Sequence, residues 1–115
     1  MTTAVSAHGG RLPTVYLRTG QLWLVRAWGG RTGHCYGYMV NLRKTAGSVL
    51  REVARNNQGR NKDGFYDSVL VLYRADSPGD AAVEVDPNCE SKPSVDNGFC
   101  DLVGFLNTPM RVIVS

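Results

Sequence analysis

The residues of this chain that could carry out covalent chemistry are two histidines and three cysteines. The histidines are His8 and His34, and the cysteines are Cys35, Cys89 and Cys100. A cysteine attacks as the thiolate, and its ordinary pKa of about 8.5 leaves it mostly protonated unless a histidine or a helix N-terminus favours ionisation. His8 lies in a small, polar N-terminal stretch that should hold no fixed geometry. Any nucleophilic site is therefore expected to use His34.

The partner of His34 is expected to be one of the two later cysteines. Cys35 follows His34 directly, and neighbours on a strand point to opposite faces, so these two should not pair. Cys89 or Cys100 is then the candidate nucleophile. The alternative is that all three cysteines are small, half-buried side chains without chemistry.

The number and spacing of the cysteines bear on two other kinds of site. Three is an odd number, which fits neither a disulfide framework nor paired zinc knuckles. A bridge between Cys89 and Cys100 stays open for an oxidising compartment. The histidines, cysteines and carboxylates do not have the spacing of known zinc sites, and "GGRTG" lacks the ending of a phosphate-binding loop. We expect no metal and no cofactor.

Charge is distributed unevenly along the chain. Residues 1–62 hold ten of the thirteen basic residues and one acidic residue, Glu52, whereas residues 63–115 hold nine of the ten acidic residues. Either the two halves attract each other in the fold, or the basic half binds a polyanion. The basic residues alternate with tyrosines and tryptophans, which suits phosphate contact and base stacking. A non-catalytic RNA-binding module is thus one hypothesis, with contacts from Arg43, Lys44, Arg51 and Arg55.

The length of 115 residues predicts a single domain with one core. No stretch approaches the roughly 18 apolar residues of a membrane-spanning helix, and the first ten residues lack the features of a secretory signal. We expect a flexible N-terminal arm over residues 1–13 and a folded domain over residues 14–115.

Five segments rich in β-branched, aromatic and leucine residues predict strands. The run from Val69 to Tyr73 has the composition of a strand buried on both faces. The predicted strands cover residues 14–18, 21–28, 34–42, 65–74 and 81–85.

Helices are predicted in two places. In residues 45–55 the spacing of the apolar residues favours a short amphipathic helix, although a strand over 48–53 is the alternative. A second helix is expected over 99–106, and residues 56–64 and 86–98 are expected to be loops. We therefore predict the α+β class, with one antiparallel sheet and one or two helices.

Two short motifs, taken together, resemble a known family. The stretch "LRTGQLWLVRAWGGRTGHCYGYMV" (17–40) resembles the H-box of the lecithin retinol acyltransferase family, and "NCE" (88–90) is similar to its NC-box. The resemblance implies a permuted papain-like fold in which His34 is the base and Cys89 is the nucleophile that forms a thioester. Family enzymes usually carry a second histidine that orients the first. No histidine follows His34 here, so Asn41 or Asn88 would have to take that role.

The resemblance also implies a biological setting. Some picornaviruses, kobuviruses among them, carry an H-box/NC module as their 2A protein. The implied function is that of a viral nonstructural protein in the host cytoplasm, associated with replication membranes. It would act in RNA replication or on a host protein or membrane lipid, with a weak or vestigial acyltransferase or phospholipase site. Enzymatic activity stays open, and the RNA-binding module is the alternative function.

Overall fold

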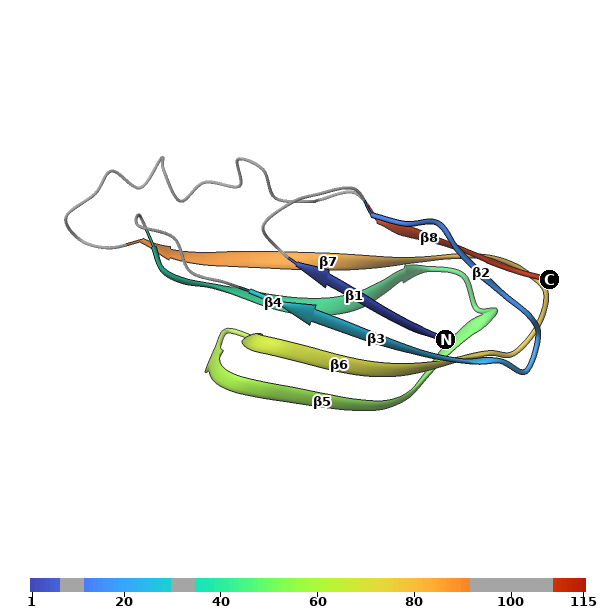
Figure 1. Cartoon of the computed structure of the whole chain (residues 1–115), viewed down its shortest axis with the longest axis horizontal. Coiled ribbons are helices and arrows are strands. Elements are labelled where there is room, and N and C mark those ends of the chain that lie inside the picture. The colour runs from blue at the N-terminus through green and yellow to red at the C-terminus, as the bar shows by residue number, and fades with distance from the viewer. Residues whose placement is uncertain (7–11, 30–34, 92–108) are drawn as a thin grey trace.

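The computed structural model describes residues 1–6, 12–29, 35–91 and 109–115, and these residues form eight strands and no helix (Figure 1). The strands in chain order are β1 (Thr2–Ser6), β2 (Val15–Leu17), β3 (Leu22–Trp28), β4 (Cys35–Ala46), β5 (Leu50–Lys62), β6 (Phe65–Ala75), β7 (Gly79–Ser91) and β8 (Met110–Val114). The predicted α+β class is therefore wrong for the described residues, and so is the permuted papain-like architecture that needs helices.

The eight strands form one curled sheet with the order β1-β3-β6-β4-β7-β8-β2, and β5 adds to β6. Its two halves are joined weakly, because β4 and β6 are paired only at Val40 and Tyr66. One half contains β1, β3, β6 and β5, and the other contains β4, β7, β8 and β2. The order β3-β6-β5 in one half and β4-β7-β8 in the other is that of the strands B-E-D and C-F-G of immunoglobulin-type β-sandwiches, whereas β1 differs from their first strand because it runs parallel to β3. The pairings β1–β3 and β2–β8 are parallel.

Inward-facing side chains from both halves enclose one core. Alternation along β3 buries Trp23, Val25 and Ala27, and the opposed strand β6 buries Val69 and Val71 beside them. The largest rings, those of Trp23 and Tyr73, stack with centroids 5.5 Å apart. No polar or charged residue of the described part is fully buried apart from Tyr73, which is itself part of the core. The core therefore depends on contacts between strands that are far apart in the sequence.

The helix predicted over residues 45–55 is replaced by a turn and the first part of β5. Leu50 is fully buried, but Val53 is 45% exposed and sits at a bulge, so the apolar spacing does not mark one buried helical face. Ten of the thirteen residues of β5 instead pair antiparallel with residues of β6. Long-range pairing thus outweighs the local helical pattern. The helix predicted over 99–106 lies outside the described residues.

Two predicted loops are also largely strand. Residues 56–62 of the predicted loop 56–64 belong to β5, and only Asp63 and Gly64 turn the chain into β6. Their φ angles of 55° and 83° are those of a two-residue type I′ hairpin, for which Asp-Gly is a preferred sequence. Residues 86–91 of the predicted loop 86–98 extend β7. Residues 2–6, within the predicted arm, form β1.

Candidate functional site

Most of the predicted catalytic groups lie outside the described residues. His34, His8 and Cys100 fall outside them, and so does the side chain of Cys89. The backbone of Cys89 pairs with Tyr38, and Cys35, which follows His34 in the sequence, pairs with Ser91. Strands β4 and β7 thus bring the chain segments that carry the two motifs to the same end of the sheet. The thiol–imidazole pair stays a prediction.

The two asparagines proposed to orient the histidine occupy different settings. Asn88 is half-buried in β7, opposite Met39. The Oδ1 atom of Asn41 accepts hydrogen bonds from the backbone N–H of Leu42 at 2.9 Å and from Nη1 of Arg55 at 2.8 Å. The side-chain oxygen of Asn41 therefore already serves the contact between β4 and β5.

Arg55 of β5 links this strand to β4, although the two strands are not paired in the sheet. Its Nη2 donates to the carbonyl oxygen of Leu42 at 2.6 Å and to Oε1 of Glu52 at 2.7 Å. Its side chain is only 24% exposed. Lys44 spans the same gap in the other direction, donating from Nζ to the carbonyl oxygen of Leu50 at 2.8 Å. These contacts hold the two halves of the sheet together at this edge.

The buried hydroxyl group of Tyr73 lies beneath this edge. The Tyr73 side chain is fully buried, and its hydroxyl has no hydrogen-bond partner among the described residues. Burial raises the pKa of Tyr73 to about 12, since the phenolate would lose its hydration there. The positive charge of Arg55 opposes this shift only in part. At neutral pH the hydroxyl is thus protonated and chemically inert.

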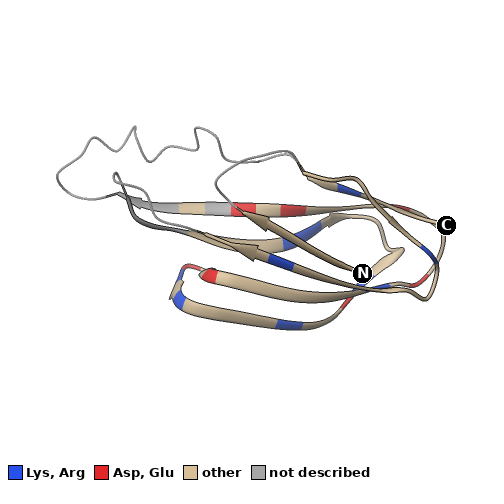
Figure 2. Ribbon diagram, viewed as in Figure 1, with Lys and Arg blue, Asp and Glu red and all other residues tan. Residues whose placement is uncertain are grey.

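Carboxylates of the acidic half neutralise arginines of the basic half. Arg43 donates to Asp86 at 3.0 Å and to Glu84 at 3.4 Å, and Arg51 donates to Asp76 at 2.8 Å. Figure 2 shows the acidic segments of β7 beside the basic segment of β4. The charge asymmetry of the sequence therefore corresponds to attraction within the fold.

The same pairing bears on the RNA-binding hypothesis. Each of its four proposed contacts, Arg43, Lys44, Arg51 and Arg55, has an intramolecular partner. A phosphate would have to compete with these partners for every one of the side chains. RNA binding stays a prediction, and the geometry does not favour it.

Two outer faces of the curled sheet differ in their side chains. We call the outer face of β3, β6 and β5 the leucine face; its outward residues are Leu22, Leu24, Arg26, Trp28, Leu70, Leu72, Arg74, Arg51, Ala54 and Asn56. We call the outer face of β4, β7 and β8 the ion-pair face; its charged residues are Arg43, Glu84, Asp86, Asp80 and Arg111. Cross-strand register places the members of each set on one side of their half.

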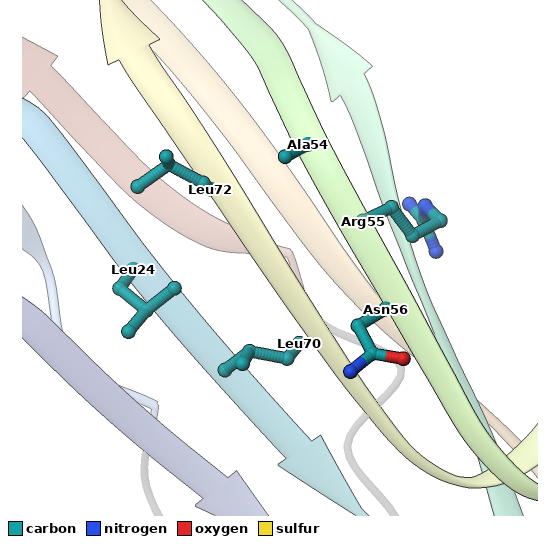
Figure 3. Close-up of a pocket in the computed structure, with 6 residues that line it drawn as sticks. All are labelled: Leu24, Ala54, Arg55, Asn56, Leu70 and Leu72. Carbon is teal, nitrogen blue, oxygen red and sulfur yellow. The ribbon is translucent and has the colours of Figure 1, made fainter.

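The leucine face contains a groove with a volume of about 240 Å³ (Figure 3). Its apolar lining comes from Leu24 on β3, Leu70 and Leu72 on β6, and Ala54 on β5. Figure 3 shows that the side chain of Arg55, at the far margin, extends away from the leucines and toward β4. The groove is thus an apolar depression on a solvent-facing sheet surface, without catalytic groups.

The sequence carried a signal for this groove, which the prediction of a strand buried on both faces over Val69–Tyr73 misread. The stretch "LWLVRAW" is apolar at both alternating sets of positions, and so is the run from Val69 to Tyr73. The structure buries Val69, Val71 and Tyr73 but leaves Leu70 and Leu72 only half-buried. Apolar residues on the outer, solvent-facing side of an antiparallel sheet indicate a surface that another element or a partner covers.

Two kinds of feature are absent from the part of the chain that the structure describes. No group of three or more histidine, cysteine or acidic side chains is arranged to hold a metal ion within the described ranges. No helix in these ranges is long and apolar enough to cross a membrane.

No protein-family model and no curated protein matches this sequence. Among solved structures, the chain is similar to the cysteine protease inhibitor EhICP2 from Entamoeba histolytica, with a TM-score of 0.52 and 8% sequence identity. The alignment covers 99% of this chain and 97% of that chain. At this identity the likeness is one of fold. The solution structure of amebosin aligns over 100% and 99% of the two chains at 13% identity, but its TM-score of 0.41 carries no conclusion.

Proposed function

We propose that this protein is a non-catalytic binding protein that inhibits a cysteine protease. The observation that carries the proposal is the fold likeness to EhICP2, a cysteine protease inhibitor, over nearly the whole of both chains. A further feature supports it, since a rigid sheet with one core is a suitable scaffold for recognition.

The end of the sheet that holds the β5–β6 hairpin is the proposed contact region. Register places the end of β3, the start of β4, the turn at Asp63 and Gly64, and the end of β7 at this end. The chain also leaves the described strands here after β1, after β3 and after β7. In immunoglobulin-type domains the loops that gather at one end of the sandwich form the binding site. The opposite end has shorter connections, among them the turn between β6 and β7.

Inhibition of a papain-type protease tests the proposal. Papain, titrated to known active-site concentration, is assayed with a fluorogenic peptide in the presence of the full chain. We expect saturable inhibition that survives Cys89→Ala, since the thiol takes no part in it. Absence of inhibition at concentrations well above those of papain overturns the proposal for this protease class, and loss of inhibition in Cys89→Ala replaces it with a thiol-based reaction.

A matched pair of insertions identifies the contact region. Two glycines inserted between Asp63 and Gly64 should weaken inhibition by about tenfold or more, because they displace the hairpin at the proposed contact. The same insertion between Ser77 and Pro78, in the turn at the opposite end, should leave inhibition unchanged. Thermal unfolding of both variants checks that the sheet is intact. Equal effects of the two insertions contradict the placement of the contact.

A further inference from the structure

The outward positions of β6 break the pattern that the rest of the sheet follows. On β7, the outward residues Ala82, Glu84 and Asp86 are small or charged, as expected for a face in contact with water. On β6, the corresponding positions hold Leu70 and Leu72. Leu22 of β3 continues the apolar surface and is 49% exposed. The leucine face therefore exposes apolar surface to water that the stability of the sheet does not require.

Register arranges this face in rows that run across the strands. Leu24, Leu72 and Ala54 form the central row, because Leu24 and Ala54 are each paired with Leu72. On one side of this row, Arg26 is paired with Leu70, and on the other side Arg74 is paired with Leu22. Successive outward residues of a strand are about 6.6 Å apart, so each arginine lies about one such step from the apolar centre.

The charges of the leucine face have one sign. Its outward strand positions carry Arg26, Arg74 and Arg51, and the nearest carboxylate, Asp76, lies at the rim and is shared by Arg51 and Arg74. Arg26 has no carboxylate partner among the described residues, and its guanidinium lies 5.4 Å from the centre of the Trp28 ring. Stacking on an aromatic ring holds a guanidinium in place while leaving its N–H groups available.

We propose that the leucine face binds an acidic peptide segment of a partner protein, with an apolar side chain in the groove and carboxylates on both sides of it. The groove accepts a side chain of leucine or phenylalanine size against Leu24, Leu70 and Leu72. One carboxylate meets Arg26, which has no carboxylate partner among the described residues, and the other meets Arg74 in competition with Asp76. In an extended segment, residues two apart are also about 6.6 Å apart, so an acidic–x–apolar–x–acidic pattern matches the rows.

A second copy of this chain fits the face less well. Two leucine faces packed against each other would oppose arginines to arginines, and only Asp76 at each rim would offset them. The proposed surface is also distinct from the end of the sheet assigned to protease contact. The proposal for the leucine face therefore does not depend on whether the protein inhibits a protease.

Three short blocked peptides and amide chemical shifts of the ¹⁵N-labelled full chain test the proposal. The probe is Glu-Ser-Phe-Ser-Glu, and its controls are Lys-Ser-Phe-Ser-Lys and Glu-Ser-Ser-Ser-Glu. We expect the probe to shift the amides of Leu24, Arg26, Leu70 and Leu72 in a saturable way. Each control should bind about fivefold or more weaker, because it lacks either the charges or the ring.

Substitutions then assign the contacts. Leu24→Thr and Arg26→Glu should each weaken binding of the probe by about fivefold or more, whereas Arg111→Glu, on the ion-pair face, should leave it unchanged. Equal binding of the lysine peptide, shifts confined to the ion-pair face, or unchanged binding by both leucine-face variants overturns the proposal. So does a concentration-dependent dimer, seen by sedimentation, that Leu24→Thr dissolves, because a second copy is then the occupant. Binding to phosphatidylserine vesicles in place of the probe would assign the face to a membrane surface.

Discussion

The ion-pair face and the leucine face lie on the same curled sheet, yet they use charge in opposite ways. On the ion-pair face, Arg43 is tied to Glu84 and Asp86, and Arg111 to Asp80. On the leucine face, Arg26 is stacked on Trp28 and has no carboxylate partner in the described part of the chain. The first arrangement holds strands together, and the second leaves a basic group beside an apolar groove. The comparison of Arg43 with Arg26 teaches that a carboxylate partner marks an arginine that stabilises the fold. An arginine without such a partner is available to a ligand.

The comparison requires that the leucine face lies outside the core, which neighbouring residues of β3 can test. Trp23→Ala should lower the free energy of unfolding by about 3–5 kcal/mol, because the ring is fully buried against Tyr73 and its Nε1 donates to Thr3. Leu24→Ala, one residue on, should cost about 1 kcal/mol or less, since its side chain is only half-buried. Urea unfolding of both variants measures these changes. Similar losses would mean that the leucine face is part of the core.

A second test concerns the interior behind the leucine face. Tyr73→Phe should raise the free energy of unfolding by about 1 kcal/mol, because it removes a buried hydroxyl without a hydrogen-bond partner. Spectrophotometric titration should show one tyrosine in the wild type with a pKa of about 12, which is absent in the variant. Destabilisation by Tyr73→Phe would indicate that the hydroxyl has a partner and that the edge beneath Arg55 is polar.

The salt dependence of stability should differ between substitutions on the two faces. Arg43→Ala should lower the melting temperature slightly at low salt, and the loss should shrink as salt screens the exposed pair. Arg26→Ala should change stability less, because it breaks no ion pair. Equal costs for the two variants would erase the distinction between the faces. Thermal unfolding at two salt concentrations is the measurement.

The smallest expected effect is the pH dependence at the rim of the leucine face. Hydrogen bonds from Arg51 and Arg74 hold the pKa of Asp76 below its ordinary value of 3.8. The stability that Asp76 contributes is therefore present above about pH 4 and is lost as the pH falls through its lowered pKa. Asp76→Asn should flatten the fall in melting temperature between about pH 5 and pH 2. An unchanged profile would mean that Asp76 is not held by the two arginines.

Strands with local apolar patterns were the part of the fold that the sequence predicted well. The predicted strands 21–28 and 65–74 coincide with β3 and β6 within one residue at each end. The β5–β6 hairpin was missed because residues 56–62 are polar and suggest a loop, although Asp63-Gly64 carried the turn signal. These residues are strand because β6 supplies hydrogen bonds along the length of β5, which no local pattern reports.

The sequence also predicted the candidate sites only in part: it indicated residue types but not their contacts. The sequence indicated a thiol and an imidazole, and the strand register brings Cys35 opposite Ser91 near the end of β7. The family resemblance left Asn41 or Asn88 as a substitute orienting group, but Asn41 accepts a hydrogen bond from Arg55, fourteen positions away in the sequence. The basic residues proposed for RNA were visible in the sequence, whereas the carboxylate partners of Arg43 and Arg51 depended on the pairing of β4 with β7 and of β5 with β6. Contacts of this kind follow from topology.

The sequence by itself determined a single small domain, the alternating strands that supply its core, and the charge balance between its halves. Only the tertiary structure decided the all-strand fold, the pairing of those charges, and which apolar residues stay outside. The physical reason is the separation along the chain over which each interaction acts. Strand propensity and alternation act between neighbours in the chain, whereas burial and ion pairing depend on which strands lie side by side. Leu72 shows the limit, since its sequence context resembles that of a buried residue and only its place on the outer face of β6 leaves it half-buried at the groove.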